Sequence, residues 1–397
     1  MITFRQLLHP ISVEDFFAQL HGKRAVHIPG NDDKLANVFS WDEFNRLLNQ
    51  TTLWSDQSTK MVLNGRSLDS SEFCSAGRNR EGNRAMMLDP RRVAKHLRGG
   101  ATLILDVVER LSPGISAVTT SLEMAMGVPA VCNAYCSWSA QQGFPPHFDN
   151  TDVFALHIAG QKTWRIYEGR FLHPVGGTEF HYLALSPAQR ERARGKVLQE
   201  VSMNPGDVLY IPRGQYHDAT ATSDASLHLS FGIERPTGLD FMKLLSRSLP
   251  DDALFRQELP HVDDVEGYQV HLRKLADRLH DIIAASDTAS QTRRELRRRT
   301  YRNSLHHFSL PTRDMMESYR VRKHHTKLSE QGNHHVLQTA HAQATLSVDQ
   351  AKIVEWVLER DWFTADCLTE AFNGHASSTL TEMLTQLAEM GVIEHVE

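Results

Sequence analysis

Three side chains that lie far apart in the sequence have the types needed to hold one metal ion. His147 and Asp149 are separated by one residue in the segment PPHFDN. Side chains two residues apart on an extended chain project from the same face, so both point toward one ion while Phe148 turns into the opposite layer. We predict that the third ligand is His217, which follows the strand-like segment DVLYIP and a Pro-Arg-Gly turn.

Two imidazoles and one carboxylate on one side of an ion leave its other coordination positions open. This arrangement is the facial triad of non-haem Fe(II) oxygenases, with room for a bidentate co-substrate and dioxygen. The same ligands also suit zinc or manganese. The alternative is that the two histidines are core residues and Asp149 a turn residue, which is the better interpretation of an isolated His-x-Asp. The whole set, with a cationic residue nearby in sequence, favours metal binding.

A lysine is expected deeper in the same cavity. Residues 153–159 and 162–167 are predicted to pair as a hairpin through Gly160-Gln161, with Lys162 at the start of the second strand. A buried ammonium is costly unless it is paired, so it implies an anionic partner such as a co-substrate carboxylate. The alternative is a lysine that reaches solvent at the end of the hairpin.

Polar side chains alternate along two further strand-like segments. In VCNAYCSW, Asn133, Tyr135 and Ser137 share one face, opposite small apolar residues, as in a strand that lines a wet cavity. Asn133 and Tyr135 are candidates to hydrogen-bond co-substrate carboxylates, or else form a satisfied core pair. In SLHLSFGI, His228 and Ser230 alternate with apolar residues and are weaker candidates.

The elements expected around these residues form a mixed α+β protein. Between residues 128 and 234, short β-branched and aromatic runs alternate with Gly and Pro turns, which indicates a sandwich or barrel. Residues 1–100 mix helices and strands, including a Ser40-x-x-Glu43 capping box that opens a helix through Leu48. We predict a catalytic barrel with this N-terminal α/β elaboration over residues 1–236.

The segments after Pro236 are predicted to be largely helical. Three helical segments lie between residues 239 and 305, which gives a helical segment over 237–320. A polar, His-rich stretch, 321–345, is expected to be an irregular linker. Three short helices and an apolar tail over 346–397 look like a winged-helix domain, and this domain is acidic. From Asp349 onward it has two basic residues against ten acidic ones, a balance of −8 that repels phosphate, so DNA binding is not expected.

Composition narrows the class of protein. The 397 residues carry a formal charge of −5, which gives no global basic field for nucleic acid. Four scattered cysteines without CxxC pairs exclude a disulfide framework and argue against structural zinc. The N-terminus lacks a signal peptide and no stretch is long and apolar enough to span a membrane, so a cytoplasmic protein is expected.

Two helical clusters allow alternative interpretations. Arginines gather in one stretch and suit contact with RNA or an acidic partner, but a solvated helix face is favoured: Arg293, Arg294, Arg297, Arg298, Arg299 and Arg302. Apolar positions in the preceding helix suit internal packing or a dimer interface: Leu272, Leu275, Leu279, Ile282 and Ile283.

The sequence resembles the JmjC-type ribosomal oxygenases, the cupin-like protein hydroxylases. The resemblance rests on the Asn-x-Tyr strand, QGFPPHFD, the Lys that opens TWRIYEG, PGDVLYIPRGQYH and LHLSFG, and it follows the order of elements over nearly the whole chain. It implies a double-stranded β-helix, Fe(II) at His147, Asp149 and His217, and 2-oxoglutarate with its 5-carboxylate on Lys162. Asn133, Tyr135 and Ser230 match positions that line that pocket.

The resemblance also implies partners. The helical segment of such proteins builds a homodimer, and their substrates are histidine or arginine residues of ribosomal proteins. The lysine at position 162 resembles the eukaryotic branch, because bacterial arginine hydroxylases carry arginine there. Alternatives are a tailoring oxygenase acting on a peptide or small molecule, a non-oxidative cupin or binding module, and a demethylase with the same iron chemistry.

Overall fold

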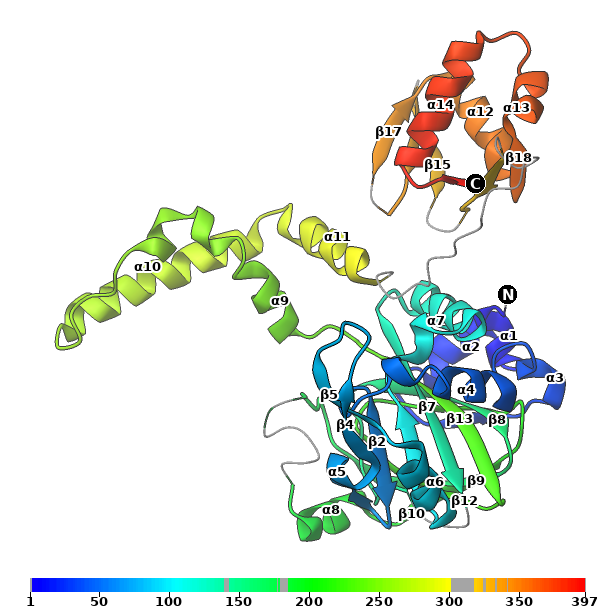
Figure 1. Ribbon diagram of the computed structural model, residues 1–397. Helices are drawn as coiled ribbons and strands as arrows, with labels where there is room; N and C mark the ends of the chain where they lie inside the picture. The colour runs from blue at the N-terminus through cyan, green and yellow to red at the C-terminus, as the bar shows by residue number, and fades with distance from the viewer. Residues whose placement is uncertain are drawn as a thin grey trace. The chain divides into compact units, whose positions relative to one another are not determined.

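The computed structural model describes residues 2–138, 143–176, 178, 185–300, 318–323, 326–332, 334–340 and 342–396. These residues form two compact units (Figure 1). The first contains the described residues up to Thr288, and the second contains the strands and helices from Ser318 onward.

An antiparallel sheet of eight strands is the centre of the first unit, in the order β1-β11-β8-β13-β7-β6-β2-β3. Strands β7 and β13 pair over nine residues, from Ala225↔Trp138 to Ile233↔Ala130. The strands of this sheet are β1 (Val26–Ile28), β2 (Thr59–Leu63), β3 (Arg66–Ser67), β6 (Thr102–Leu105), β7 (Ala130–Trp138), β8 (Asp152–Ala159), β11 (Val208–Ile211) and β13 (Ala225–Ile233).

A second sheet of three strands, in the order β10-β9-β12, faces the first one. Its strands are β9 (Lys162–Arg170), β10 (Val197–Met203) and β12 (Gln215–Ala221). Apolar side chains of both sheets meet in one buried cluster, with Trp164 and Ile166 from β9 against Val153 from β8 and Leu209 from β11. Two facing antiparallel sheets make the predicted cupin-like barrel.

The expected hairpin between residues 153–159 and 162–167 is wrong. Strand β8 pairs with β11 and β13, whereas β9 pairs with β10 and β12, so Gly160-Gln161 is a corner at which the chain passes from one sheet to the other. A two-residue turn between alternating segments resembles a hairpin in sequence. Here long-range partners on both sides decide which sheet each strand joins.

Helices cover the outer face of the large sheet. α7 (Pro113–Met126) contacts β7 and β13, and α1 packs on α7 (Figure 1). The predicted helix of the capping box is α4 (Trp41–Leu48), whose N-cap Ser40 accepts a hydrogen bond from the Glu43 amide. The remaining elements of this region are α1 (Phe4–Leu8), α2 (Val13–Asp15), η1 (Phe16–Leu20), α3 (Asp32–Leu35), η2 (Thr51–Leu53), α5 (Ser70–Phe73), β4 (Cys74–Arg78), β5 (Arg84–Leu88), α6 (Pro90–Arg98), η3 (Val108–Arg110) and α8 (Pro187–Arg194).

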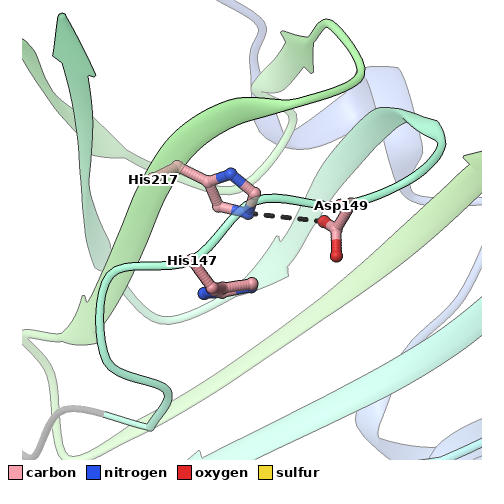
Figure 2. Close-up of side chains that lie close together, drawn as sticks. All are labelled: His147, Asp149 and His217. Carbon is pink, nitrogen blue, oxygen red and sulfur yellow. Dashed lines mark ion pairs between the residues drawn. The ribbon is translucent and has the colours of Figure 1, made fainter. Parts of the chain in front are cut away.

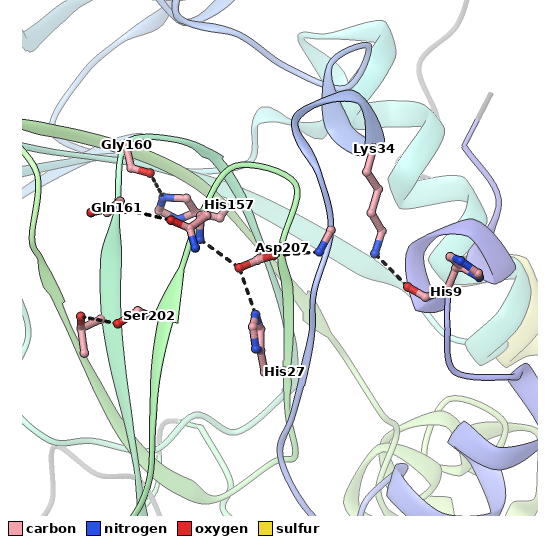
Figure 3. Close-up of polar contacts among 11 residues, drawn as sticks. His9, His27, Lys34, His157, Gly160, Gln161, Ser202 and Asp207 are labelled. Carbon is pink, nitrogen blue, oxygen red and sulfur yellow. Dashed lines mark hydrogen bonds and ion pairs between the residues drawn. The ribbon is translucent and has the colours of Figure 1, made fainter.

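A buried aspartate holds the turn that leads into β11. The Asp207 carboxylate accepts hydrogen bonds from His27 Nε2 (3.0 Å), the Gly30 amide (2.8 Å) and the Asn204 amide (3.0 Å) (Figure 3). Charge-assisted bonds of this kind are stronger than neutral ones. They connect β1, the edge strand of the large sheet, and the loop after it to the turn before β11, the strand that precedes His217.

The three helices predicted after the barrel are present: α9 (Gly238–Leu245), α10 (Val265–Ala284) and α11 (Thr288–Thr300), with short turns η5 (Leu249–Asp251) and η6 (Ala253–Arg256). The twenty residues of α10 include none that is fully buried. Leu272 and Ile283 on its apolar side are 53% and 42% exposed. In the arginine cluster, Arg302 lies outside the described residues, as do the side chains of Arg297, Arg298 and Arg299.

The second unit corrects the expected linker. A three-stranded meander lies in residues 321–345 and ends one residue beyond them: β15 (Lys327–Gln331), β16 (His334–Gln338) and β17 (Gln343–Leu346). It contacts α12 (Val348–Leu358). Leu337 and Leu346 from this meander are buried with the side chains of the C-terminal helices in one core. The other elements are β14 (Ser318–Val321), α12 (Val348–Leu358), β18 (Trp362–Thr364), α13 (Ala365–Ala371), α14 (Ser377–Glu389) and β19 (Ile393–Val396), with sheet order β18-β14-β19. The winged-helix assignment stays a prediction.

Two expectations from composition are tested directly. All four cysteines are free, as their scatter in the sequence predicts. Among the described residues, none of the helices combines the length and the apolar character that crossing a membrane requires.

Candidate metal centre

The backbone brings the two histidines together. His147 and His217 form an isolated antiparallel bridge, in which the His147 amide donates to the His217 carbonyl at 3.0 Å and the His217 amide donates back at 2.8 Å. Their imidazole centroids are 4.5 Å apart. Main-chain hydrogen bonds between the two ligand residues therefore hold them side by side, although they are seventy positions apart in the sequence.

Asp149 completes the predicted set. Its Oδ2 lies 3.5 Å from His217 Nε2, and one ligand atom from each of the three residues lies within 4.8 Å of the others (Figure 2). Phe148 points the other way, as the strand parity predicts, and stacks on Phe171 with centroids 4.8 Å apart. Among the described residues, this is the group of histidine, cysteine and carboxylate side chains arranged to hold a metal.

Each imidazole is oriented by a hydrogen bond to the main-chain carbonyl two residues earlier in the sequence. His147 Nδ1 lies 2.9 Å from the Pro145 carbonyl oxygen, and His217 Nδ1 lies 2.9 Å from the Gln215 carbonyl oxygen. A carbonyl oxygen accepts, so each Nδ1 carries the proton and each Nε2 keeps its lone pair for a metal. Gln215 is itself anchored, because its side-chain amide donates to the Gly169 carbonyl at 3.0 Å.

The surroundings of His217 favour its neutral form. Burial, together with the nearby imidazole of His147, lowers the pKa of His217 to about 4, so this imidazole is unprotonated at neutral pH. The Trp164 ring stacks on His217 with centroids 5.9 Å apart and an interplanar angle of 29°. Two imidazoles and one carboxylate beside a cavity are a donor set that fits Fe(II).

Lys162 lies in the cavity that the three ligands border, and it is 5% exposed. Burial lowers its pKa to about 8. Its ammonium donates to Ser137 Oγ at 3.2 Å, and Ser137 Oγ is 3.0 Å from Thr102 Oγ1. The lysine therefore does not reach solvent, and the cavity contains a cation near the metal ligands.

Two predicted residues on β7 have different positions. Tyr135 lines the cavity and stacks on His228, with centroids 4.7 Å apart. Asn133 is not among the lining residues: its side-chain oxygen accepts from the Val107 amide at 3.1 Å, and it hydrogen-bonds the Tyr135 hydroxyl. The structure thus places Asn133 beside Tyr135 on the same face of β7, where its side chain contacts this hydroxyl.

The two weaker candidates on β13 both reach the cavity. His228 and Ser230 line it, while Leu227, Leu229 and Phe231 lie in the core beneath the helices, as the alternation predicts. Burial moves the pKa of His228 far below its ordinary value, so its imidazole is neutral.

Sequence reasoning missed Thr102 and Trp164, which also line the cavity. Trp164 follows Lys162 by two residues, so strand parity was a sufficient signal for it. Thr102 had no such signal, because it lies in β6, before the stretch from residue 128 to residue 234 in which the sequence indicates the barrel.

The barrel and its ligand set define a class. Residues 115–241, which include all three ligands and Lys162, match the family described as JmjC domain. The chain therefore carries a JmjC domain on a cupin-like barrel.

Its sequence relatives are ribosomal oxygenases. The chain is 30% identical over 274 residues to ribosomal oxygenase 1 of Gallus gallus, covering 67% of this chain and 43% of that protein. It is 28% identical over 281 residues to the bifunctional lysine-specific demethylase and histidyl-hydroxylase NO66 of Dictyostelium discoideum, covering 68% and 51%. The chain thus spans about half the length of the curated relatives it matches, and the resemblance predicted from the sequence is confirmed.

A solved structure shows the same fold. YcfD, a ribosomal oxygenase from Escherichia coli determined in complex with cobalt and 2-oxoglutarate, superposes with a TM-score of 0.55 at 18% identity. The match covers 97% of this chain and 98% of the other. At this identity the likeness concerns the fold.

Proposed function

We propose that the protein is an Fe(II)- and 2-oxoglutarate-dependent hydroxylase. The observation that carries this proposal is the convergence of His147, Asp149 and His217 within 4.8 Å at a cavity that also contains the buried ammonium of Lys162. A metal-binding face and a separate cationic group suit an anionic co-substrate that reaches from one to the other.

Each residue has a defined part in this proposal. His147, Asp149 and His217 would hold Fe(II), which with 2-oxoglutarate and dioxygen supplies the oxidising chemistry. Lys162 would bind the 5-carboxylate, and Tyr135 and Ser230 offer hydroxyl groups along the same wall. Asn133 supports the Tyr135 hydroxyl, so its contribution to co-substrate binding is indirect. The buried walls exclude water and orient the reactants.

We infer that the substrate is a histidine or arginine side chain of a ribosomal protein. Relatives of this chain are named ribosomal oxygenases and a histidyl-hydroxylase, and the family that the sequence resembles also includes arginine hydroxylases. One of those names also includes a lysine demethylase activity. The test is mass spectrometry of ribosomes from cells with and without the gene. Gain of one oxygen atom on one protein supports hydroxylation, and loss of a methyl group instead identifies a demethylase.

Binding of the co-substrate tests the iron chemistry first. The protein loaded with Mn(II) without oxygen should bind 2-oxoglutarate, and the Fe(II) form in air should convert it to succinate. His147→Ala should abolish both, because two ligands cannot hold the metal. His280→Ala, at an exposed position of α10, is the matched control and should behave as wild type. Turnover by His147→Ala with no bound metal would refute the proposal.

We propose that the protein works as a homodimer joined through α10. This helix has no fully buried residue, and its apolar side includes the exposed Leu272 and Ile283. An uncovered apolar helix face of this length is costly in water, and pairing with a second copy removes it from solvent.

The C-terminal unit is proposed to contact protein and not DNA. From Asp349 onward the chain has two basic and ten acidic residues, and several of the acidic side chains are exposed. A field of this sign repels phosphate and attracts basic proteins. Electrophoretic mobility of double-stranded DNA at low salt should be unchanged by this protein.

A further inference from the structure

A run of buried hydroxyl groups leads from β6 to the ammonium of Lys162. Thr102 Oγ1 lies 3.0 Å from Ser137 Oγ, and Ser137 Oγ accepts a hydrogen bond from Lys162 Nζ at 3.2 Å. Thr102 and Ser137 are directly opposite each other in the β6–β7 register. The three side chains are 2%, 3% and 5% exposed, so water does not substitute for these contacts.

The ammonium depends on this one hydroxyl. A lysine ammonium has three N–H donors, and within the described part of the chain its hydrogen-bond partner is Ser137. No carboxylate of the described residues lies within ion-pair distance of Lys162 Nζ. The titratable groups close enough to affect its charge are Cys136 on β7, His157 on β8 and His228 on β13.

These three groups do little to stabilise the positive charge of the Lys162 ammonium. Burial lowers the pKa of both histidines, so they are neutral at pH 7, and burial raises the pKa of the Cys136 thiol, which keeps its proton. Ser137 is therefore the polar contact that both stabilises the charged form of Lys162 and fixes where its ammonium points.

Thr102 connects this contact to the loop that carries the metal ligands. It lines the cavity, and a side-chain carbon at Gly143 would lie 3.2 Å from its hydroxyl oxygen. Gly143 precedes His147 by four residues, so Thr102 lies against the loop leading to the ligands on one side and Ser137 on the other. Thr102 is also outside residues 115–241, the range of the JmjC match.

We propose that Ser137 and Thr102 are positioning residues that hold the Lys162 ammonium in the cavity, ready for the distal carboxylate of the co-substrate. The inference rests on the proposed function. It assigns to β6, a strand outside the JmjC match, a part in the affinity for an anionic co-substrate. Neither hydroxyl needs to touch the co-substrate, because both act through the lysine.

The test is calorimetric titration of Mn(II)-loaded full-length protein with 2-oxoglutarate in the absence of oxygen. Ser137→Ala should raise Kd about tenfold, the scale of one hydrogen bond to a charged group, and Thr102→Val about threefold. Ser137→Thr and Thr102→Ser keep the hydroxyls and should restore binding. The pH above which affinity falls should also shift downward in Ser137→Ala, because the ammonium loses the contact that favours its charged form.

Ser226→Ala is the matched control. Ser226 pairs with Ser137 across β13 and β7, is fully buried, and its hydroxyl has no hydrogen-bond partner among the described residues. It should bind 2-oxoglutarate as wild type does. Thermal melting of each variant separates loss of binding from loss of fold, and if Ser137→Ala fails to fold, Thr102→Val paired with Thr102→Ser decides.

The outcomes are distinguishable. Wild-type binding with unchanged Kd and pH profile in Ser137→Ala and Thr102→Val would overturn the inference and leave the proposed function intact. A wild-type protein that binds Mn(II) but not 2-oxoglutarate would overturn the proposed function itself, and the inference with it.

Discussion

Two glutamates are buried behind the strand that carries Tyr135. Glu123 on α7 accepts a hydrogen bond from the Ala130 amide at 3.0 Å, and Glu109 accepts one from the Cys132 amide at 2.9 Å. Both side chains are 0% exposed. Burial raises the pKa of Glu123 to about 8, and the charge of Glu109 adds to this rise, so Glu123 keeps its proton at neutral pH.

This proton makes stability depend on pH. Between the ordinary pKa of about 4.5 and about 8, the unfolded chain ionises Glu123 and the folded chain does not, so the free energy of unfolding falls as pH rises. Glu123→Gln keeps the shape and removes the ionisation. It should be about 1–3 kcal/mol more stable than wild type at pH 8 and nearly equal at pH 4.5, measured by urea unfolding. The exposed Glu81→Gln should show no such pH dependence; an equal effect in both variants would contradict this account.

The sequence predicted the positions of single side chains correctly where the local backbone geometry decides which way they point. His147 and Asp149 needed only the alternation of an extended chain, and so did Ser230, whereas Lys162 was expected from its place at the start of a strand. Asn133 was placed on the correct face, but its partner is the Val107 amide, in a residue with the unusual φ of 60°. A strained turn of a β-branched residue has no sequence signal, so the supporting role of Asn133 was not predictable.

At the scale of elements, the corner at Gly160 separates the two sheets. Its φ is +73°, and a side-chain carbon there would lie 1.9 Å from the Ala225 carbonyl oxygen, which no rotation of a side chain relieves. Lys162 begins β9 two residues later, so the corner also sets where its ammonium enters the cavity.

Gly160→Ala should therefore lower the free energy of unfolding by much more than the strain that a positive φ alone imposes on alanine. We expect a loss of about 3 kcal/mol or more in unfolding free energy, together with weaker 2-oxoglutarate binding. Gly82→Ala is the control, because Gly82 has a φ of +81° with nothing within 4 Å, so it should lose only about 1 kcal/mol. Chemical denaturation of both variants makes the comparison, and equal losses would mean that the backbone clash at Gly160 relaxes without cost.

Strands were identified well and their partners less well. Segments such as VCNAYCSW and SLHLSFGI were recognised because their alternation is local. Whether β8 pairs with β9 depends on where β11, β12 and β13 lie, and that is decided by contacts distant in sequence. The meander from 327 to 346 was missed because its short strands are rich in histidine and glutamine, and only a few of their side chains, such as Leu337, reach the core.

At the scale of the whole molecule, the proposed dimer predicts that one substitution in α10 will halve the mass of the particle in solution. Leu272→Glu or Ile283→Glu places a charge on the apolar side of α10 and should convert a dimer to a monomer in light scattering after size exclusion. Lys274→Glu, about 200° around the helix from Leu272, is the matched control and should remain dimeric. A wild-type protein that is monomeric at micromolar concentration would remove the basis of this prediction.

The paired main-chain hydrogen bonds between His147 and His217 have a consequence for assembly of the metal centre. Because the polypeptide itself fixes the two imidazoles side by side, no ion is needed to gather them. Chelators should then remove the metal without unfolding the barrel, and different divalent ions should be able to exchange at the same preformed site. Which ion the protein carries in a cell would follow from what its surroundings supply.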